Sequence, residues 1–124
     1  MLVGIDVLDV VRMDKFVQNE RSLDKFFTEY EIMYVSSTRR TTQSLAGIYC
    51  AKEAFLKALG VGIGGGINLN EIEIKHHENG KPYLQVLSSK AKIMLSTQKI
   101  EEIEINISHT DEICTAVCIL KNRN

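Results

Sequence analysis

Two carboxylates in apolar surroundings are the residues of this chain that could do chemistry. Asp6 interrupts the apolar run of residues 2–8, and Glu53 stands among the small residues of a predicted helix face. A buried carboxylate costs several kcal/mol unless a partner compensates its charge. Asp6 alone fits a hydrogen-bonded structural role as well as a metal or catalytic one, and Glu53 alone fits an i, i+4 pair with Lys57. Together they form the hard oxygen pair that Mg²⁺ takes beside waters and phosphates.

Basic residues that could meet phosphates surround these carboxylates in the sequence: Lys52, Lys57, Arg39 and Arg40. Ser108 and His109 lie at a predicted strand end, where functional groups are often found. The adjacent His76 and His77 point to opposite faces of another predicted strand, so they cannot chelate one ion together. We interpret this histidine pair as surface residues.

The glycine-rich segment 60–66 contains the string G-x-G-x-x-G but lacks its usual context. A dinucleotide fingerprint follows a strand and opens a helix, whereas this segment follows a predicted helix and leads to a strand. We therefore predict a flexible connection. The cysteines Cys50, Cys114 and Cys118 are odd in number, which indicates free thiols in a reducing compartment. On a strand, Cys114 and Cys118 would stand roughly 13 Å apart, which is too far to share a metal ion.

Length and composition favour one small domain covering residues 1–124. The chain has a mass of 14.0 kDa, 44% hydrophobic and 25% charged residues, and a net charge of -1. These values are ordinary for a globular protein and argue against a nucleic-acid binder, which would be strongly basic. No apolar run approaches the ~20 residues of a membrane span, and the first residues lack the basic region of a signal peptide. We therefore expect a cytoplasmic protein that binds neither nucleic acid nor membrane.

The first half of the chain predicts one strand followed by helices. Residues 2–8 form a strand that is apolar on both faces, which predicts burial on both sides. Asp9 is a candidate N-cap for a helix with an apolar stripe, Ser22 for a short turn, and Thr28 with Glu31 forms a capping box. The stripe of the first helix consists of Val10, Met13, Phe16 and Val17. The strongest helix runs from Leu45 to Leu59 and ends at Gly60.

The second half predicts two strand pairs separated by a helix. Residues 71–77 and 83–87 form a hairpin, with Pro82 opening its second strand, and residues 88–99 are amphipathic. Residues 102–109 and 112–120 alternate between apolar and polar positions around a tight turn. Strands and helices do not alternate regularly, so the sequence predicts an α+β fold with mainly antiparallel pairing.

Three segments resemble the bacterial holo-acyl-carrier-protein synthases, the short 4′-phosphopantetheinyl transferases. They are Val3-Gly4-Ile5-Asp6-Val7 through Arg12-Met13, the helix from Ala51-Lys52-Glu53-Ala54 to Gly62, and Ile107-Ser108-His109-Thr110. Thr28-x-x-Glu31 and Asn79-Gly80-Lys81-Pro82 stand at the expected places between them. The similarity spans nearly the whole chain, and the A-K-E-A segment is its most specific part.

The resemblance implies that the phosphopantetheine arm of coenzyme A moves to a serine of apo acyl carrier protein during fatty acid biosynthesis. The products would be holo carrier protein and adenosine 3′,5′-bisphosphate. It implies that Asp6 and Glu53 hold Mg²⁺ and that Lys57 neutralises charge on the pyrophosphate. Glu53 is the first choice for the base that accepts the serine proton, and Asp6 is the second choice. The residues at positions that grip the nucleotide half are Arg39, Arg40, Gly62, Pro82, Ser108, His109 and Thr110.

The same resemblance implies the fold, the assembly and the partner. Family members of this length have the small single-domain phosphopantetheinyl transferase fold, an antiparallel sheet packed against helices, and are homotrimers with active sites at subunit interfaces. Arg12 falls on a position that meets the acidic carrier protein. The predicted carrier-docking residues are Arg12, Lys15, Arg21 and Lys25, which stand on or near the outward face of the first helix.

The chain departs from the family pattern at several positions. Ile48 replaces an arginine that contacts coenzyme A, Leu2 replaces the first glycine of an early G-x-G-x-D, and Asp9 replaces a glutamate. These departures concern the grip on phosphates rather than the reaction. Two other readings share parts of the pattern. A Mg²⁺-dependent nucleotide hydrolase would use the same carboxylates without a carrier protein, and a non-catalytic trimeric binding module would tolerate their loss.

Overall fold

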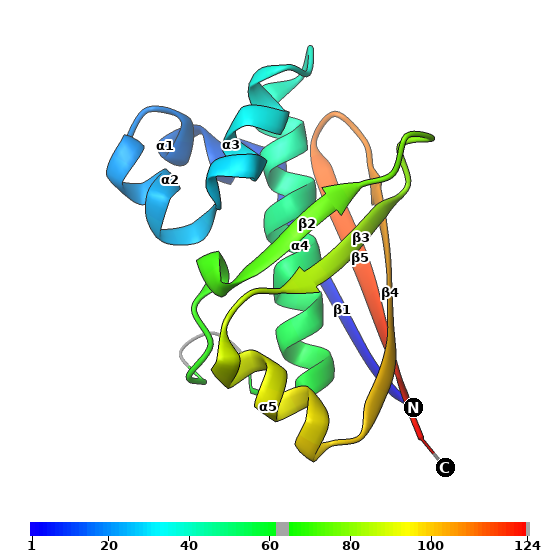
Figure 1. Cartoon of the computed structure of the whole chain (residues 1–124). Coiled ribbons are helices and arrows are strands. Elements are labelled where there is room, and N and C mark those ends of the chain that lie inside the picture. The colour runs from blue at the N-terminus through cyan, green and yellow to red at the C-terminus, as the bar shows by residue number, and fades with distance from the viewer. Residues whose placement is uncertain (62–64, 124) are drawn as a thin grey trace.

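A computed structural model of the chain describes residues 1–61 and 65–123. Its centre is the helix α4 (Thr41–Leu59), which lies between two antiparallel sheets (Figure 1). The larger sheet has the strand order β1-β5-β4 and lies behind α4 in this view, while the hairpin β2-β3 crosses in front. The strands are β1 (Leu2–Asp9), β2 (Ile72–His76), β3 (Pro82–Val86), β4 (Ile100–His109) and β5 (Ile113–Asn122). The predicted α+β class with antiparallel pairing is confirmed.

The helix α4 is buried on most of its surface because both sheets pack against it. Gly60 ends the helix in the left-handed conformation, with φ +82°, as its lack of a Cβ allows. The helix begins at Thr41, four residues before the predicted start at Leu45. Residues 41–44 are polar, so the first turn carries no hydrophobic periodicity that would reveal it.

Strand β1 is buried on one side only, so the prediction of burial on both sides is wrong for the single chain. Gly4, Asp6 and Leu8 face α4, whereas Val3, Ile5 and Val7 are 57%, 66% and 62% exposed. The approach to α4 is very close. A Cβ at Gly4 would collide with the carbonyl oxygen of Ala54 and with the backbone nitrogen of Ala58, so only glycine fits there.

The helices between β1 and α4 differ from the predictions at their starts. Asp9 belongs to β1, and its side chain makes no capping hydrogen bond to the short helix η1 (Val10–Met13) or to α1 (Asp14–Val17). Val17 of the predicted apolar stripe is exposed. Asn19, rather than Ser22, caps α2 (Glu20–Phe26) by accepting from two backbone amides. The predicted capping box of Thr28 and Glu31 is confirmed at the start of α3 (Glu29–Ser36).

The remaining elements follow the predictions closely. The short helix η2 (Leu69–Glu71) precedes the hairpin, and Ser88 caps α5 (Ser89–Thr97). The three cysteines are buried free thiols. The predicted flexible connection at 60–66 includes residues 62–64, which lie outside the described residues. Within the described part of the chain, no helix is long and apolar enough to cross a membrane.

Candidate active site

Asp6 and Lys57 form an ion pair where β1 crosses α4. Asp6 is 8% exposed, and Lys57 Nζ donates to Asp6 Oδ1 at 3.0 Å and to the carbonyl oxygen of Ile5 at 3.2 Å. Asp6 therefore does have a compensating partner, and it is a lysine rather than an arginine or a helix N-terminus. The i, i+4 alternative required Lys57 to pair with Glu53 along α4. Lys57 instead pairs with Asp6 of β1. This contact raises the pKa of Lys57, which keeps its ammonium charged.

Glu53 lies beside this pair with its side chain partly buried. Burial raises the pKa of the Glu53 carboxyl, and the charge of Asp6 adds to the rise. Tyr49 lies in the same environment, and its pKa is raised to about 12 by burial and by the Glu53 carboxylate. Glu53 and Asp6 are thus close enough to influence each other, and proximity to Arg12 and Lys57 partly offsets their charge.

Asp6 and Glu53 together suit a divalent cation that also binds ligands from outside the protein. The described residues include no cluster of three or more His, Cys, Asp or Glu side chains that could hold a metal. A protein-only cage is therefore not formed by this part of the chain. Mg²⁺ commonly takes one or two carboxylates and completes its shell with waters and substrate phosphates. The donor set of Asp6 and Glu53 fits that pattern.

Lys52 has a structural role, which corrects its prediction as a phosphate contact. Its side chain is fully buried, and Nζ donates to Glu31 Oε1 at 2.6 Å. The same ammonium donates to the carbonyl oxygens of Phe26 and Leu69 at 2.9 and 2.8 Å. Because these partners use its three donors, Lys52 has none left for a phosphate.

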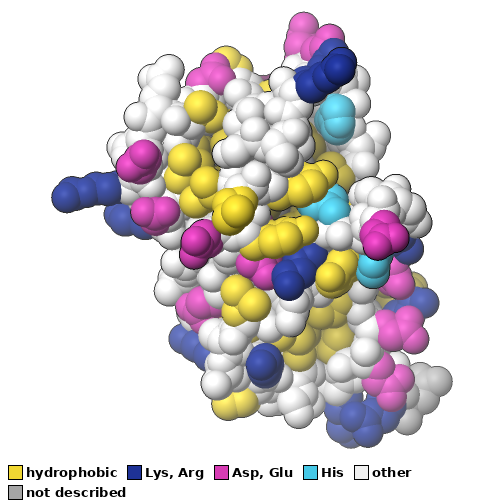
Figure 2. Space-filling view, turned by 45° about the horizontal axis from the view of Figure 1, so that its top comes forward, with side chains coloured by type: hydrophobic (Ala, Val, Ile, Leu, Met, Phe, Trp, Pro, Cys, Tyr) yellow, Lys and Arg dark blue, Asp and Glu magenta, His cyan; other side chains and the backbone are white. Residues whose placement is uncertain are grey.

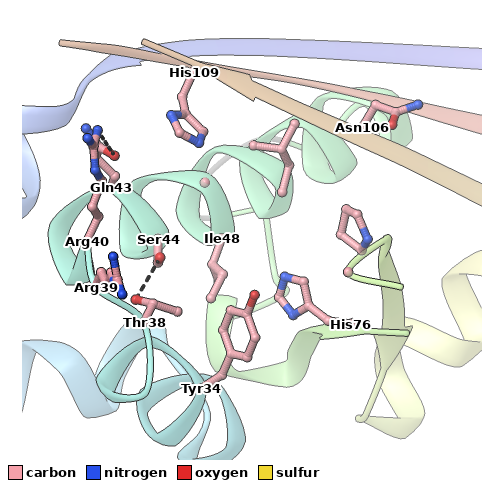
Figure 3. A pocket seen from close by; sticks show the side chains of 14 residues that line it. Tyr34, Thr38, Arg39, Arg40, Gln43, Ser44, Ile48, His76, Asn106 and His109 are labelled. Atoms are coloured by element: carbon pink, nitrogen blue, oxygen red, sulfur yellow. Dashed lines mark hydrogen bonds between the residues drawn. The ribbon is translucent and has the colours of Figure 1, made fainter. Parts of the chain in front are cut away.

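A cavity of about 430 Å³ opens on the other side of α4 (Figure 3). Four of the predicted nucleotide-binding residues line it: Arg39, Arg40, Pro82 and His109. Ile48, the predicted replacement of an arginine, also lines the cavity and gives it an apolar wall there. Arg40 is partly engaged, since its Nη1 donates to Asp111 Oδ1 at 2.6 Å on the exposed rim.

The other predicted nucleotide-binding residues lie elsewhere. Ser108 is paired with Thr115 in the sheet and is exposed. The Thr110 hydroxyl accepts from the backbone amides of Glu112 and Ile113, which shapes the turn between β4 and β5. Lys57 is on the Asp6 side of α4, and Gly62 lies outside the described residues. One chain therefore does not bring the whole predicted set together.

The cavity also contains residues that the sequence analysis missed, above all His76 and Tyr34. The interpretation of His76 as a surface residue is wrong, because its ring is partly buried and stacks on Tyr34. The alternation of β2 could have revealed this. Ile72, Ile74 and His76 share one strand face, and both isoleucines are fully buried. His77, on the opposite face, is exposed as predicted.

A family model of the 4′-phosphopantetheinyl transferase superfamily matches residues 2–118. The chain belongs to this superfamily. Among curated relatives, the holo-[acyl-carrier-protein] synthase of Fusobacterium nucleatum is 34% identical over 122 residues, covering 97% of this chain and 99% of that one. The synthase of Caldanaerobacter subterraneus is 38% identical over 120 residues, covering 96% of this chain and 93% of that one.

Solved structures of superfamily members have the same fold. The Helicobacter pylori holo-[acyl-carrier-protein] synthase in complex with coenzyme A is 27% identical, with a TM-score of 0.83 over 97% of this chain and 100% of that one. A Bacillus anthracis holo-(acyl-carrier-protein) synthase in complex with CoA (3′,5′-ADP) is also 27% identical, with a TM-score of 0.80 over 98% and 96% of the two chains.

Within one chain of this superfamily member, α4 separates the carboxylates from the cavity. Asp6, Glu53 and Lys57 are not among the residues that line the cavity. At 100° per residue, Glu53 lies about 150° around the helix axis from the middle of the cavity face. The α4 residues on that face are Gln43, Ser44, Gly47 and Ile48. The cavity and the carboxylates of one chain therefore lie on different faces of α4.

The predicted carrier-docking residues Arg12, Lys15, Arg21 and Lys25 are all exposed. Arg12 is near Glu53, since it lowers the pKa of that carboxyl. On α2, each basic residue directly follows an acidic one in the sequence: Arg21 follows Glu20, and Lys25 follows Asp24. Figure 2 shows acidic and basic side chains mixed at this end of the molecule. On α2 the basic residues Arg21 and Lys25 therefore form a narrow stripe, and Arg12 and Lys15 precede it on η1 and α1.

Proposed function

We propose that this chain transfers the 4′-phosphopantetheine arm of coenzyme A to a serine of apo acyl carrier protein in fatty acid biosynthesis. The observation that carries the proposal is the group of Asp6, Glu53 and Lys57 where β1 crosses α4. It occurs in a superfamily member whose relatives are named holo-[acyl-carrier-protein] synthases and whose solved neighbours include complexes with coenzyme A.

The chemistry assigned to these residues is a phosphoryl transfer. The serine oxygen of the carrier attacks the phosphorus that bears the pantetheine, and the bond to adenosine 3′,5′-bisphosphate breaks. Glu53 takes the serine proton as the general base. Lys57 offsets the negative charge that grows on the leaving group. Mg²⁺ held by Asp6 and Glu53 would supply further neutralisation of the pyrophosphate charge.

The nucleotide half of coenzyme A occupies the cavity on the far side of α4. Its cationic and polar residues suit phosphates, and its apolar walls suit a base and ribose. Arg39 and Arg40 are placed to meet phosphate oxygens, with His109 nearby on β4 (Figure 3). Pro82 contributes part of the wall from the β2-β3 hairpin.

A complete site requires a second copy of the chain. The cavity and the carboxylates of one chain lie on different sides of α4, so coenzyme A spans the cavity of one copy and the carboxylates of another. The exposed face of β1, with Val3, Ile5 and Val7 on the side of the strand opposite to Asp6, is the apolar surface for this contact. By similarity to the short synthases, the assembly is a homotrimer. The buried free thiols suit the reducing cytoplasm as its location.

The decisive experiment incubates the protein with coenzyme A, Mg²⁺ and apo carrier protein, and measures the mass of the carrier. A gain equal to the phosphopantetheine arm, lost when Mg²⁺ is chelated, supports the transfer. Hydrolysis of nucleotides without modification of the carrier would favour a hydrolase instead. Binding of coenzyme A without any reaction would favour a binding module.

A mixing experiment tests the shared site. Glu53→Gln and His109→Ala variants are each inactive in our proposal because each lacks one half of the site. Mixed and allowed to exchange subunits, they should regain part of the activity, since some interfaces then contain both intact halves. An active monomer in sedimentation, or no recovery in verified mixed oligomers, would contradict the shared site.

A further inference from the structure

The cavity beside α4 has chemically different parts. Arg39, Arg40 and Gln43 lie at one end, while the ring of His76 lies away from them beside Tyr34, with Ile48 between the two regions (Figure 3). Cationic groups recognise phosphates, and flat aromatic rings recognise nucleobases by stacking. The cavity therefore has a direction, with phosphates expected at the arginines and a base expected at the aromatic rings.

The aromatic part is a built stack rather than an isolated ring. The His76 and Tyr34 ring centroids are 3.9 Å apart with an interplanar angle of 9°. Tyr30 continues the stack from the preceding turn of α3, with the Tyr30 and Tyr34 ring centroids 6.5 Å apart and an interplanar angle of 14°. Glu31 of α3 accepts from the Ile74 amide of β2 and from the buried Lys52 of α4, so both elements that carry the stack are tied to the core.

His76 is not held as a structural histidine usually is. Its Nδ1 is buried and has no hydrogen-bond partner among the described residues, whereas buried polar atoms are normally paired. Burial lowers the pKa of the His76 ring, which favours its neutral form. Stacking on Tyr34 therefore sets the orientation of the ring, and a neutral ring can approach an uncharged base without losing the hydration of a charge.

We propose that His76, supported by Tyr34, is the stacking surface for the nucleobase of the donor in this cavity, an inference that rests on the proposed transfer from coenzyme A. Tyr34 covers one face of the imidazole ring. The ring also lines the cavity, so the face turned away from Tyr34 is the one that we assign to the base. His76 is thus a specificity-determining residue for the base, while the arginines hold the phosphates.

The test compares binding of two ligands by calorimetry: adenosine 3′,5′-bisphosphate and the corresponding ribose bisphosphate without a base. His76→Ala should weaken binding of the adenosine ligand about 5- to 100-fold, the usual range for loss of one stacking partner. It should leave binding of the base-free ligand unchanged. His76→Phe should restore most of the adenosine affinity, because it keeps a flat ring without the nitrogen atoms.

His77→Ala is the matched control, because His77 also stacks on a ring, Tyr83, with centroids 4.3 Å apart, but is exposed and does not line the cavity. It should change neither affinity. His76→Gln gives a second removal of the ring in case the alanine variant does not fold.

Each other outcome overturns the inference. Unchanged adenosine affinity in His76→Ala would place the base elsewhere, and an equal loss for both ligands would show that His76 only supports the cavity wall. The carrier-modification assay on the unaltered protein separates this failure from failure of the proposed function. Transfer by the unaltered protein together with unchanged His76→Ala binding would refute the stacking alone. Absence of both transfer and binding would refute both.

Discussion

Two lysines five positions apart on α4 form ion pairs of opposite character. Lys52 and Glu31 are both fully buried and are 2.6 Å apart, whereas Lys57 is 53% exposed and meets the buried Asp6 at 3.0 Å. The first pair joins α4 to α3, and the second joins α4 to β1. Both pairs use a lysine and a carboxylate, so residue type alone does not distinguish them.

The difference lies in how fully each pair is satisfied. Glu31 also accepts from the backbone amides of Thr28 and Ile74, and Lys52 donates to two carbonyl oxygens. That network is closed to any ligand. Asp6 has Lys57 as a partner but also lies beside Glu53, a second carboxylate whose negative charge is only partly offset. An open network of this kind can accept a cation or a phosphate, and this makes it the candidate for chemistry.

The largest expected effect comes from removing the carboxylates of the open pair. Glu53→Gln and Asp6→Ala should each lower the transfer rate by about 10³-fold or more, since both a base and charge stabilisation are lost. The fold should persist, because Lys57 regains water when Asp6 is removed. A mass-based transfer assay and thermal unfolding measure the two effects. Glu78→Gln, in the exposed β2-β3 turn, is the control. Full activity in either variant would contradict the site.

Removing Lys52 should have the opposite signature, a large loss of stability. Lys52→Met leaves the buried Glu31 charge without its partner, which costs about 3–5 kcal/mol in comparable cases. Lys57→Met should cost less than Lys52→Met, because the Lys57 ammonium is 53% exposed and only the Asp6 side of its pair is buried. Urea unfolding of both variants measures the free energies. Equal losses would show that the two pairs do not differ as their burial suggests.

Lys57 tests whether the open pair acts in the transition state. Lys57→Ala should lower kcat about 100-fold while the KM for coenzyme A changes little, because charge moves onto the leaving bisphosphate only during the reaction. Steady-state kinetics with coenzyme A as the varied substrate separate the two constants. A raised KM with unchanged kcat would instead make Lys57 a ground-state contact.

The sequence predicted the local features well and the long-range ones poorly. The end of α4 at Gly60 and the capping box at Thr28 depend on a few neighbouring residues, and both were correct. The role of Lys52 depends on Glu31, which is 21 positions away, and nothing local to Lys52 indicates that pairing. The one-sided burial of β1 likewise depends on which neighbour covers Val3, Ile5 and Val7, and an apolar pattern does not say whether that neighbour belongs to the same chain.

The candidate site shows the same division. Asp6 and Glu53 were singled out because carboxylates among apolar residues conflict with their surroundings, and the structure brings them together. His76 was interpreted with His77 as a surface residue, although it shares a strand face with the buried Ile72 and Ile74. Its environment comes from Tyr34, which approaches from a different helix. Residues whose role comes from a distant partner are therefore the ones that only the folded chain reveals.

The smallest expected effect concerns the approach of the carrier protein to the site of Asp6, Glu53 and Lys57. Arg12 lies near Glu53, and Lys15, Arg21 and Lys25 are exposed. An acidic carrier should be steered toward these charges, which raises the association rate without changing the chemistry. Arg12→Glu combined with Arg21→Glu should raise the KM for carrier protein about 10-fold or more, while the KM for coenzyme A stays nearly constant.

Salt decides whether this effect is electrostatic steering. The screening length falls from about 10 Å at 0.1 M to about 3 Å at 1 M salt, so the unaltered protein should lose its advantage as salt rises. The double variant should show little salt dependence, because the attraction is already absent. Lys92→Glu, an exposed charge reversal on α5, is the matched control and should behave like the unaltered protein. An equal rise in the KM for both substrates would place Arg12 with the Glu53 site itself. No rise in either KM would move carrier docking away from α1 and α2.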